Sequence, residues 1–251
     1  MKLSGNTILI TGGGTGIGLA MAEAFLKAGS EVILCGRREA RLLEVQKKHP
    51  QVHVKPCDVS STVERRALVK WVGEKFPGIN VLVNNAGIQR DIDFTHGIEQ
   101  FESGDSEIEI NLEAPIVLSG MFVPLLTGKP GATIVNVSSG LGFVPAAKMP
   151  VYSATKAGLH AFSMALRLQL SKVGIQVVEI VPPAVDTELN PEGREQRGGF
   201  KAGLSADDFV APVMKDLEAD KTEIGFGFSA GMLRASRDEL DQRFQQMNSR
   251  W

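Results

Sequence analysis

The stretch Thr7-Ile8-Leu9-Ile10-Thr11-Gly12-Gly13-Gly14-Thr15-Gly16-Ile17-Gly18 decides the fold of this chain. Residues 7–11 form an apolar, β-branched run typical of a buried strand, and residues 19–23 continue with a helical pattern. Glycines between a strand and a helix let the backbone approach a pyrophosphate, and the helix N-terminus attracts the anion. The alternative is a tight turn without a ligand. Because a strand and a helix flank the turn, the pattern favours a dinucleotide site. Its expected residues are Gly12, Thr15, Gly16, Ile17 and Gly18.

Short β-branched runs recur along the chain and alternate with longer helical patterns. Continuous apolar runs such as Val81-Leu82-Val83 are expected of parallel strands that helices cover on both faces. The sequence therefore predicts an α/β fold, a single Rossmann-type domain over residues 1–251 with a doubly wound parallel sheet of about seven strands. The expected strands are Thr7–Thr11, Glu31–Cys35, Val52–Cys57, Val81–Asn84, Thr133–Val137, Gln176–Val181 and Glu223–Phe228.

The helical patterns lie between these runs and end at glycine or proline residues. The expected helices are Ile17–Ala28, Thr62–Phe76, Glu107–Leu126 and Tyr152–Val173. Residues 188–204 show no periodicity, since prolines and glycines stand there among charges, and we expect a mobile substrate flap. Residues 205–251 are expected to complete the same domain.

The composition excludes several classes of partner. A formal net charge of -2 without a dense Lys/Arg block gives no electrostatic footprint for nucleic acid or a membrane surface, so a small-molecule partner is expected. No apolar run is expected to approach the ~18 residues that span a bilayer, and the N-terminus does not resemble a signal peptide, which predicts a cytoplasmic location. Cys35 and Cys57 form no CxxC pair and lie near no histidine cluster, which indicates buried thiols and no metal site.

The second expected strand leads into Gly36-Arg37-Arg38, where dinucleotide folds bind the adenosine ribose. An Asp or Glu there would accept hydrogen bonds from the ribose hydroxyls and repel a 2'-phosphate, whereas an arginine pairs with that phosphate through its planar fork. Arg37 therefore favours NADP(H). The alternative is that Arg37 and Arg38 are solvated charges that open the next helix.

Four further motifs follow in order along the chain. They are Asn84-Asn85-Ala86-Gly87 after the fourth strand, Ser138-Ser139 at the end of the fifth, Tyr152-Ser153-Ala154-Thr155-Lys156 at the start of a helix, and Pro182-x-x-Val185-x-Thr187 after the sixth. Together with Thr11-Gly12-x-x-x-Gly16-x-Gly18, they resemble the short-chain dehydrogenases/reductases, in particular their short single-domain branch, over about residues 1–190. The resemblance implies an enzyme that transfers hydride between a nicotinamide cofactor and a carbonyl or alcohol substrate.

The chemistry of the Tyr-x-x-x-Lys motif can also be argued from the residues themselves. Tyr152 and Lys156 lie four residues apart on a helix, so their side chains share one face. A phenol with a pKa of about 10 is a weak base near neutral pH, and a neighbouring ammonium and a positive nicotinamide ring would lower that pKa. Taken alone, such a pair is more often a surface helix pair. Ser139, thirteen residues before Tyr152 at a strand end, favours the catalytic role.

The resemblance implies the role of each residue. Tyr152 transfers the proton and Lys156 also binds the nicotinamide ribose. Ser139 hydrogen-bonds the substrate oxygen, with Ser138 as the adjacent alternative. Asn111, otherwise a tolerated polar residue in a helix, becomes the fourth catalytic member and holds a water that links Lys156 to solvent. Further cofactor contacts are implied at Asp58, Val59, Asn85, Ala86, Gly87, Val185 and Thr187.

Two residues depart from the family pattern. Pro183 stands where the family usually has glycine, and a second proline removes a backbone N–H and restricts φ. Thr15 is not the basic residue often found in NADP-dependent relatives, so NAD(H) stays a candidate beside NADP(H). The run from Pro182 to Thr187 and a tail that begins at Glu223 are similar to the DltE-like oxidoreductases.

Substrate choice is expected to lie with residues 88–94, 140–149 and 188–204, which border the tyrosine in any such fold. The mostly apolar 140–149 segment favours a medium-sized, modestly apolar carbonyl compound, although the same residues would also serve to pack the flap. His96 and His160 have no evident partner in the sequence and are expected at the surface or in helix packing.

Two of the expected helices, 107–126 and 152–173, carry apolar residues on more than one face. Together with the family resemblance, this pattern predicts a homodimer or homotetramer. The alternative is a monomer in which the C-terminal segment covers both helices.

Three rival functions share parts of this pattern. A redox sensor would keep the dinucleotide fold, but it has no need for an activated phenol. An epimerase or dehydratase of the longer branch generally adds a substrate domain, for which 251 residues leave little room. A ketoreductase for acyl-carrier substrates would favour a basic patch at the pocket mouth, and Arg90, Arg194 and Arg197 are too scattered to indicate one.

Overall fold

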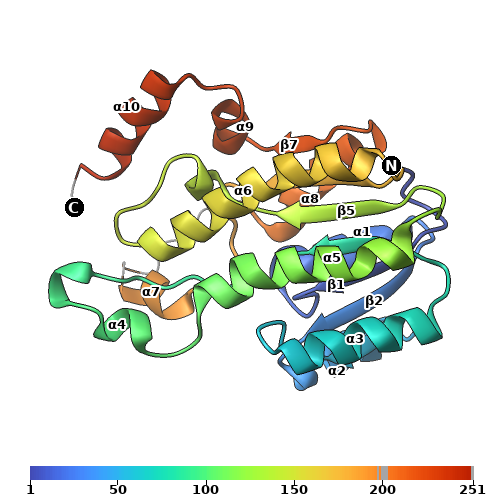
Figure 1. The fold of residues 1–251 in the computed structure, drawn as a ribbon. Coiled ribbons are helices and arrows are strands. Elements are labelled where there is room, and N and C mark those ends of the chain that lie inside the picture. Colours follow the sequence, from blue (N-terminus) through green and yellow to red (C-terminus); the bar gives the residue numbers. More distant parts are fainter. Residues whose placement is uncertain (197, 199–202, 250–251) are drawn as a thin grey trace.

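The structure is a computed structural model that describes residues 1–196, 198 and 203–249. Within this part of the chain, seven parallel strands form one sheet in the order β3-β2-β1-β4-β5-β6-β7. The strands are β1 (Thr7–Thr11), β2 (Glu31–Gly36), β3 (His53–Pro56), β4 (Ile79–Asn84), β5 (Thr133–Val137), β6 (Gln176–Val181) and β7 (Glu223–Gly225). From β1 the chain builds outward to β3 and then returns to build β4 to β7 on the other side, so the sheet is doubly wound (Figure 1).

Helices cover both faces of this sheet, with α3, α5 and α6 on one face and α1, α2 and α8 on the other (Figure 1). The helices are α1 (Gly16–Lys27), α2 (Glu39–Lys48), α3 (Thr62–Lys75), α4 (Glu99–Glu102), α5 (Ala114–Leu126), α6 (Pro150–Ser171), α7 (Pro191–Gln196), α8 (Ala206–Glu218), α9 (Phe228–Met232) and α10 (Arg237–Met247).

Two hydrophobic cores lie between these layers because alternate strand residues point to opposite faces. On β1, Ile8 and Ile10 belong to the core that also holds Phe25 of α1. Leu9, between them, belongs to the core that holds Phe122 of α5. The alternation constrains the register of the sheet. Because the central strands are parallel, their carboxyl ends lie at one edge.

The predicted α/β fold with a doubly wound parallel sheet is confirmed, and the bounds of its elements differ in detail. β4 begins at Ile79 where Val81 was expected, and β7 ends at Gly225 where Phe228 was expected. Helices α2 and α8 were not predicted. Helix α2 buries only Leu42 and Val45, so its apolar pattern is weak.

The predicted helix over Glu107–Leu126 consists of two pieces. A π-helical turn, Glu109–Glu113, precedes α5. In the described part of the chain, Glu109–Leu126 is the one helix long and apolar enough to cross a membrane by length and composition, and 44% of it is buried in the fold. The expectation that no run approaches this length was therefore wrong. Packing of Phe122 and its neighbours against the sheet accounts for the apolar character.

The expected flap over residues 188–204 is partly helical, since α7 occupies Pro191–Gln196. A bridge between Asp186 and Ser205 joins the two ends of this segment, and the N–H of Asp186 donates to the Leu204 carbonyl at 2.9 Å. Residues 197 and 199–202 of the expected flap lie outside the described residues. Mobility of the segment stays a prediction.

Candidate active site

A cleft of about 1390 Å³ opens at the carboxyl ends of the central strands. In doubly wound sheets, ligands bind at this edge, where the strand order reverses. The lining includes most of the predicted site residues: Gly12, Thr15, Gly16, Ile17, Arg37, Asp58, Val59, Asn85, Ala86, Gly87, Ser139, Tyr152, Lys156, Val185 and Thr187. Gly18 and Asn111 of the predicted set are not part of the lining.

The glycine turn packs closely against two other loops of the cleft. Gly12 has a φ of 65°, and a Cβ on it would lie 2.8 Å from the Cα of Ala86. Gly16 has a φ of 57°, and a Cβ there would lie 3.0 Å from Cγ2 of Thr187. Side chains at either position would be strained and would push the loops after β4 and β6 outward. The turn therefore presents bare backbone to the cleft.

The loop after β4 is tied to the end of β1. The N–H groups of Asn85 and Ala86 both donate to the Thr11 hydroxyl at 3.0 Å. The Asn85 amide donates to the carbonyls of Thr11 and Gly12 at 3.0 and 3.2 Å. These bonds hold the loop after β4 beside the glycine turn, so that both form one surface of the cleft.

Three arginines stand where β2 passes into α2. Arg37 pairs with Asp105, with Nη1 and Oδ2 2.5 Å apart. Arg38 and Arg41 both pair with Glu188, at 2.7 and 3.1 Å. All five side chains are at least 40% exposed. The sequence singled out Arg37, and Arg41 was missed because α2 was not predicted.

Tyr152 and Lys156 project from the first two turns of α6 and are 6% and 4% exposed. Lys156 Nζ lies 5.6 Å from the centre of the Tyr152 ring and donates to the Val137 carbonyl at 2.8 Å. Ser139, just beyond the end of β5, hydrogen-bonds to the Tyr152 phenol. The Ser139 oxygen also accepts from the Leu141 N–H at 3.1 Å. The fold thus brings the three predicted side chains together.

Burial dominates the ionisation of the tyrosine and the lysine. It raises the pKa of Tyr152 to about 12, against the Ser139 hydrogen bond, which lowers it. It lowers the pKa of Lys156 to about 8, against the negative charge of Glu179. The sequence argument expected Lys156 to lower the tyrosine pKa. In the structure, the pKa of Tyr152 is raised instead, because desolvation of the phenolate and the charge of Glu107 outweigh the Ser139 hydrogen bond.

Asn111 sits in the π-helical turn before α5 and is fully buried. Its amide oxygen accepts from the Ile88 N–H at 2.9 Å, and its amide nitrogen donates to the Ile88 carbonyl at 2.8 Å and to the Thr155 hydroxyl at 3.3 Å. A Cβ placed on Gly87 would be 3.3 Å from the Asn111 oxygen and 3.8 Å from Lys156 Nζ. The asparagine and the lysine therefore border the same point beneath the cleft.

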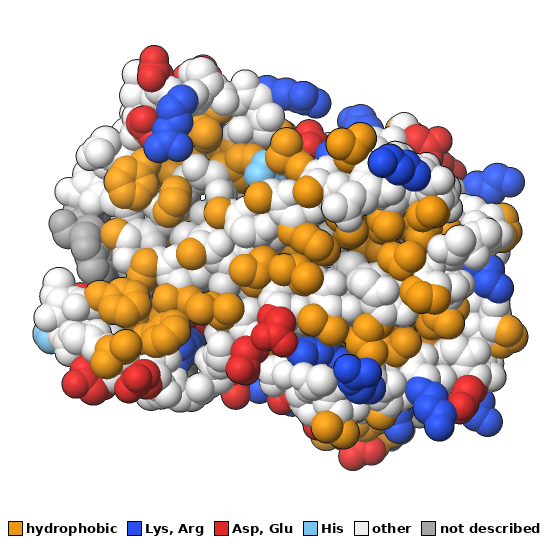
Figure 2. All heavy atoms as spheres, in the orientation of Figure 1, with side chains coloured by type: hydrophobic (Ala, Val, Ile, Leu, Met, Phe, Trp, Pro, Cys, Tyr) orange, Lys and Arg blue, Asp and Glu red, His pale blue; other side chains and the backbone are white. Residues whose placement is uncertain are grey.

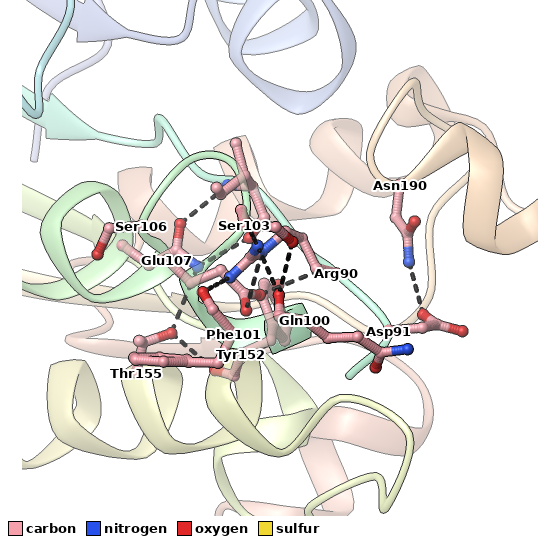
Figure 3. Close-up of polar contacts among 12 residues, drawn as sticks. Arg90, Asp91, Gln100, Phe101, Ser103, Ser106, Glu107, Tyr152, Thr155 and Asn190 are labelled. Carbon is pink, nitrogen blue, oxygen red and sulfur yellow. Dashed lines mark hydrogen bonds and ion pairs between the residues drawn. The ribbon is translucent and has the colours of Figure 1, made fainter. Parts of the chain in front are cut away.

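Arg90 and Glu107 fix the loop that follows β4 (Figure 3). The Arg90 guanidinium donates to the carbonyls of Gln100 at 3.2 Å, Phe101 at 3.1 Å and Ser103. Glu107 is buried, its Oε1 accepts from the Arg90 N–H at 3.1 Å, and burial raises the pKa of its carboxyl group. The charge of Arg90 is thus committed to this loop.

This geometry agrees with the comparisons to known proteins. A family model described as short chain dehydrogenase matches residues 6–198. The chain belongs to the short-chain dehydrogenase/reductase family. The uncharacterized oxidoreductase DltE of Bacillus subtilis is 47% identical over 249 residues, which is 99% of each chain, and confirms the DltE-like resemblance.

Solved structures of the family share the fold of this dehydrogenase. A short-chain dehydrogenase from Sphingobium yanoikuyae in complex with NADPH is 27% identical, with a TM-score of 0.79 over 98% of this chain and 96% of that one. A short chain dehydrogenase/reductase from Burkholderia phymatum in complex with NAD reaches 0.82 over 97% and 96% at 21% identity, which shows the fold alone. The chain is an oxidoreductase of a family that binds nicotinamide nucleotides.

The C-terminal segment of the dehydrogenase forms a wall of the cleft that the sequence analysis missed. Phe228, Met232, Met247 and Asn248 line the cleft. The Asn248 amide oxygen accepts from the Ala147 N–H at 2.7 Å, and its amide nitrogen donates to the Pro145 carbonyl at 3.0 Å. Helix α10 itself buries no residue, so its end is what holds it to the loop after β5.

The three segments expected to set substrate choice all reach the cleft. Ile88, Met149 and Leu189 are among the lining residues of the three segments. The Asn190 amide donates to the Asp91 carboxylate at 2.8 Å and so links the loop after β4 to the 188–204 segment (Figure 3).

A buried acidic side chain behind the site was also missed. His160, whose partner was not evident in the sequence, lies on α6 with its Nδ1 2.8 Å from Oε2 of Glu179. Ser138 donates to Oε1 of the same carboxylate at 2.5 Å, so its hydroxyl is committed there and Ser139 faces Tyr152. His96 lies at the surface as expected, with 73% of its side chain exposed.

The two cysteines are free and buried. They hydrogen-bond to each other, and this bond together with burial raises the pKa of Cys35. In the part of the chain that the structure describes, no group of three or more His, Cys, Asp or Glu side chains could hold a metal ion.

Proposed function

We propose that this chain is an NADP(H)-dependent carbonyl reductase or alcohol dehydrogenase in which Tyr152 donates or accepts the proton. The observation that carries the proposal is the convergence of Tyr152, Ser139 and Lys156 in one cleft with the glycine turn. A volume of about 1390 Å³ accommodates a dinucleotide and a substrate together, since drug-sized ligands occupy cavities of ~300–1,000 Å³.

The cleft fits a dinucleotide along its whole length. The bare backbone at Gly12 and Gly16 suits a pyrophosphate, which would also meet the N-terminus of α1. Arg37, with Arg38 and Arg41 beside it, would hold the adenosine 2'-phosphate. When bound, the nicotinamide ring supplies or accepts the hydride. We assign the remaining contacts to Thr15, Ile17, Asp58, Val59, Asn85, Ala86, Gly87, Lys156, Val185 and Thr187. Gly18 would support the turn from outside the cleft lining, since a Cβ there would lie 2.5 Å from the Gly12 carbonyl oxygen.

Four residues would each have a separate role in transferring the proton. Ser139 would donate a hydrogen bond to the carbonyl oxygen of the substrate, which polarises the carbonyl group. Tyr152 would then release its proton to that oxygen as the alkoxide forms. The Lys156 ammonium stabilises the resulting phenolate. Asn111 would hold the water through which Lys156 exchanges protons with solvent.

The environment of Tyr152 keeps the phenol protonated in the absence of cofactor. A phenol with a pKa of about 12 is neutral near pH 7 and so is ready to donate a proton. In the opposite direction it must first lose that proton, which requires the positive charges of Lys156 and an oxidised nicotinamide ring nearby. The substrate we propose is a medium-sized carbonyl compound with an apolar group, because Phe228, Met232 and Met247 line the cleft.

We also propose that the protein assembles as a homodimer or homotetramer through α5 and α6. Figure 2 shows apolar side chains spread over one face of the molecule. Ile116 of α5 and Met164 and Leu168 of α6 are 38%, 51% and 73% exposed. A Leu168→Glu substitution would place a charge in the proposed interface between subunits. Light scattering after gel filtration would then show a smaller species than the wild type.

The test of the function is titration of the purified protein with NADPH and NADH, followed by absorbance of the reduced nicotinamide across a panel of ketones, aldehydes and diketones. We expect tight NADPH binding and consumption with at least one apolar carbonyl compound. Tyr152→Phe, which keeps the ring, is the matched control and should bind NADPH without consuming it. Binding without turnover by any compound would favour a redox sensor, and equal turnover by Tyr152→Phe would remove the tyrosine from the mechanism.

A further inference from the structure

The buried carboxylate of Glu179 lies directly behind the reacting residues. It stands on β6, is fully buried, and has a hydrogen-bond partner on each oxygen. Ser138 donates to Oε1 at 2.5 Å, and the His160 ring nitrogen Nδ1 lies 2.8 Å from Oε2. Its neighbours along the strand are aliphatic. Burying a carboxylate costs several kcal/mol unless it is well paired, and apolar replacements of such pairs are often as stable.

Both partners of Glu179 belong to the elements that carry the reacting side chains. Ser138 directly precedes Ser139 at the end of β5. His160 follows Lys156 by one turn of α6 and Tyr152 by two, so the three side chains lie along one face of the helix. Glu179 therefore holds the strand end and the helix from behind.

The charges around this group are few. Lys156 is buried, and Glu179 is the acidic side chain that raises its pKa against the lowering effect of burial. From α6, Arg167 also acts on His160, and from β7 Glu223 does so, although these two pair with each other at 3.1 Å. Phe143, whose ring centre is 4.5 Å from that of His160, covers the histidine from the turn after β5.

We propose that Glu179 is a positioning residue for the reaction: it anchors the strand end that presents Ser139, and it supplies the negative charge that balances the buried ammonium of Lys156. The proposal rests on the function proposed above, in which Lys156 must stay positive to stabilise a phenolate. His160 tunes this charge. When the histidine is protonated it neutralises the carboxylate, and when it is neutral the carboxylate acts on Lys156 at full strength.

Deprotonation of His160 strengthens the effect of the Glu179 charge and so favours the protonated form of Lys156. The hydrogen bond to Glu179 raises the pKa of His160 above its ordinary value. As the pH rises through that pKa, the histidine loses its charge and the field of Glu179 at Lys156 increases. This increase opposes the loss of the Lys156 proton, because burial lowers the pKa of Lys156 to about 8 and the charge of Glu179 raises it. The pairing of Glu179 with His160 thus extends the pH range over which Lys156 keeps its positive charge.

The first experiment measures the titration of Lys156 directly, without any substrate. Trace acetylation of the whole protein between pH 6 and 11, with mass spectrometry of the peptide that holds Lys156, gives the midpoint of that lysine. For the Glu179→Gln variant, which keeps the shape and a hydrogen-bond acceptor for Ser138, the midpoint is expected to fall by about one pH unit. An unchanged midpoint would leave Glu179 as a purely structural group and overturn the proposal.

Two further variants separate charge from damage to the fold. Glu23→Gln removes a carboxylate of another Glu–His pair, with His49 at 2.9 Å, far along the chain and outside the cleft, and should leave the Lys156 midpoint unchanged. His160→Gln removes the neutralising partner, so the midpoint should stay or rise. A fall in His160→Gln of the same size as in Glu179→Gln would indicate disrupted packing and count against the proposal. If Glu179→Gln folds poorly, a fall of the Lys156 midpoint in His160→Gln alone would count against the proposal, because that variant keeps the Glu179 charge.

The second experiment uses turnover. In Glu179→Gln, the alkaline limb of kcat/KM should move to lower pH by the same amount as the Lys156 midpoint, while the NADPH Kd stays within about twofold of the wild-type value. A lowered melting temperature with an unmoved limb would contradict the positioning role. If the wild type consumes no carbonyl compound, the proposed function fails, whereas a shifted Lys156 midpoint would still establish the charge balance.

Discussion

The two ends of the cleft are built on opposite principles. At the reacting end, Tyr152, Lys156 and Asn111 are each less than 10% exposed. At the other end, Arg37, Arg38 and Arg41 are half exposed and pair with acidic side chains from distant loops. At the buried end, placing a charge on a side chain costs free energy, and the side chains are fixed in place. At the exposed end, the ion pairs are weak, so the arginines change partners at little cost in free energy. Under the proposed function, burial would set the chemistry and surface charges would set the choice of cofactor.

The largest effect is expected from Lys156→Met, which removes the buried positive charge from the reacting end of the cleft. Turnover should fall by about 10²–10⁴-fold, because the phenolate loses its neighbouring cation. Stability should change in the opposite direction: the lysine pKa of about 8 lies below its ordinary 10.5, so the charged side chain costs stability below pH 8, and this cost disappears between pH 8 and 10.5. Thermal melts across this range should show the variant's advantage shrinking as the pH rises. A constant difference would contradict the buried charge.

The second largest effect concerns the acid dissociation constant of Tyr152, which we expect to be about a hundredfold smaller than that of an exposed tyrosine. The chain has one tyrosine, so tyrosinate absorbance or a single ¹³C resonance reports Tyr152 alone. We expect a midpoint near 12 where an exposed tyrosine has 10.0, and saturating NADP⁺ should lower it. Because the folded-state pKa is raised, the stability that the tyrosine contributes is complete below pH 10 and is lost as the pH rises to 12. A midpoint near 10 would mean that the phenol is solvated.

At the exposed end, Arg37→Ala is expected to weaken NADPH binding by about tenfold while NADH changes by less than about twofold. The reason is that only NADPH carries the 2'-phosphate. Isothermal titration with both nucleotides measures the difference. Arg66→Ala, an exposed arginine of α3 outside the cleft, is the matched control. Equal losses for both nucleotides would remove Arg37 from cofactor choice.

The smallest effect is expected from Glu188→Gln. This change removes the carboxylate that pairs with Arg38 and Arg41 and so frees Arg38 for a phosphate, whereas Arg41 keeps its pair with Glu44 at 3.0 Å. NADPH affinity should rise by about two- to threefold, since exposed pairs contribute ~0.2–1 kcal/mol. The NADH affinity should not change. Weaker NADPH binding would indicate that Glu188 holds the arginines in place for the nucleotide.

The contrast between the two ends also explains what the sequence could predict. The glycine turn and the Tyr-x-x-x-Lys pair are local patterns, and both were found because residues close in sequence make them. Glu179 and His160 meet across β6 and α6, a contact that depends on sheet register. Phe228 and Met247 reach the cleft only through the path of the C-terminal segment. Such contacts are set by tertiary packing, which periodicity does not encode.

Helix α10 works as a spacer, and its length counts for more than its sequence. It buries no residue, yet the residue after its end, Asn248, is fastened to the loop after β5. Insertion or deletion of one residue within Arg237–Met247 would rotate that end by about 100° and carry Met247 out of the wall. Point substitutions along the outer surface would leave the wall unchanged. Relatives that differ in the length of this helix should therefore differ in the carbonyl compounds they accept, even where every reacting residue is the same.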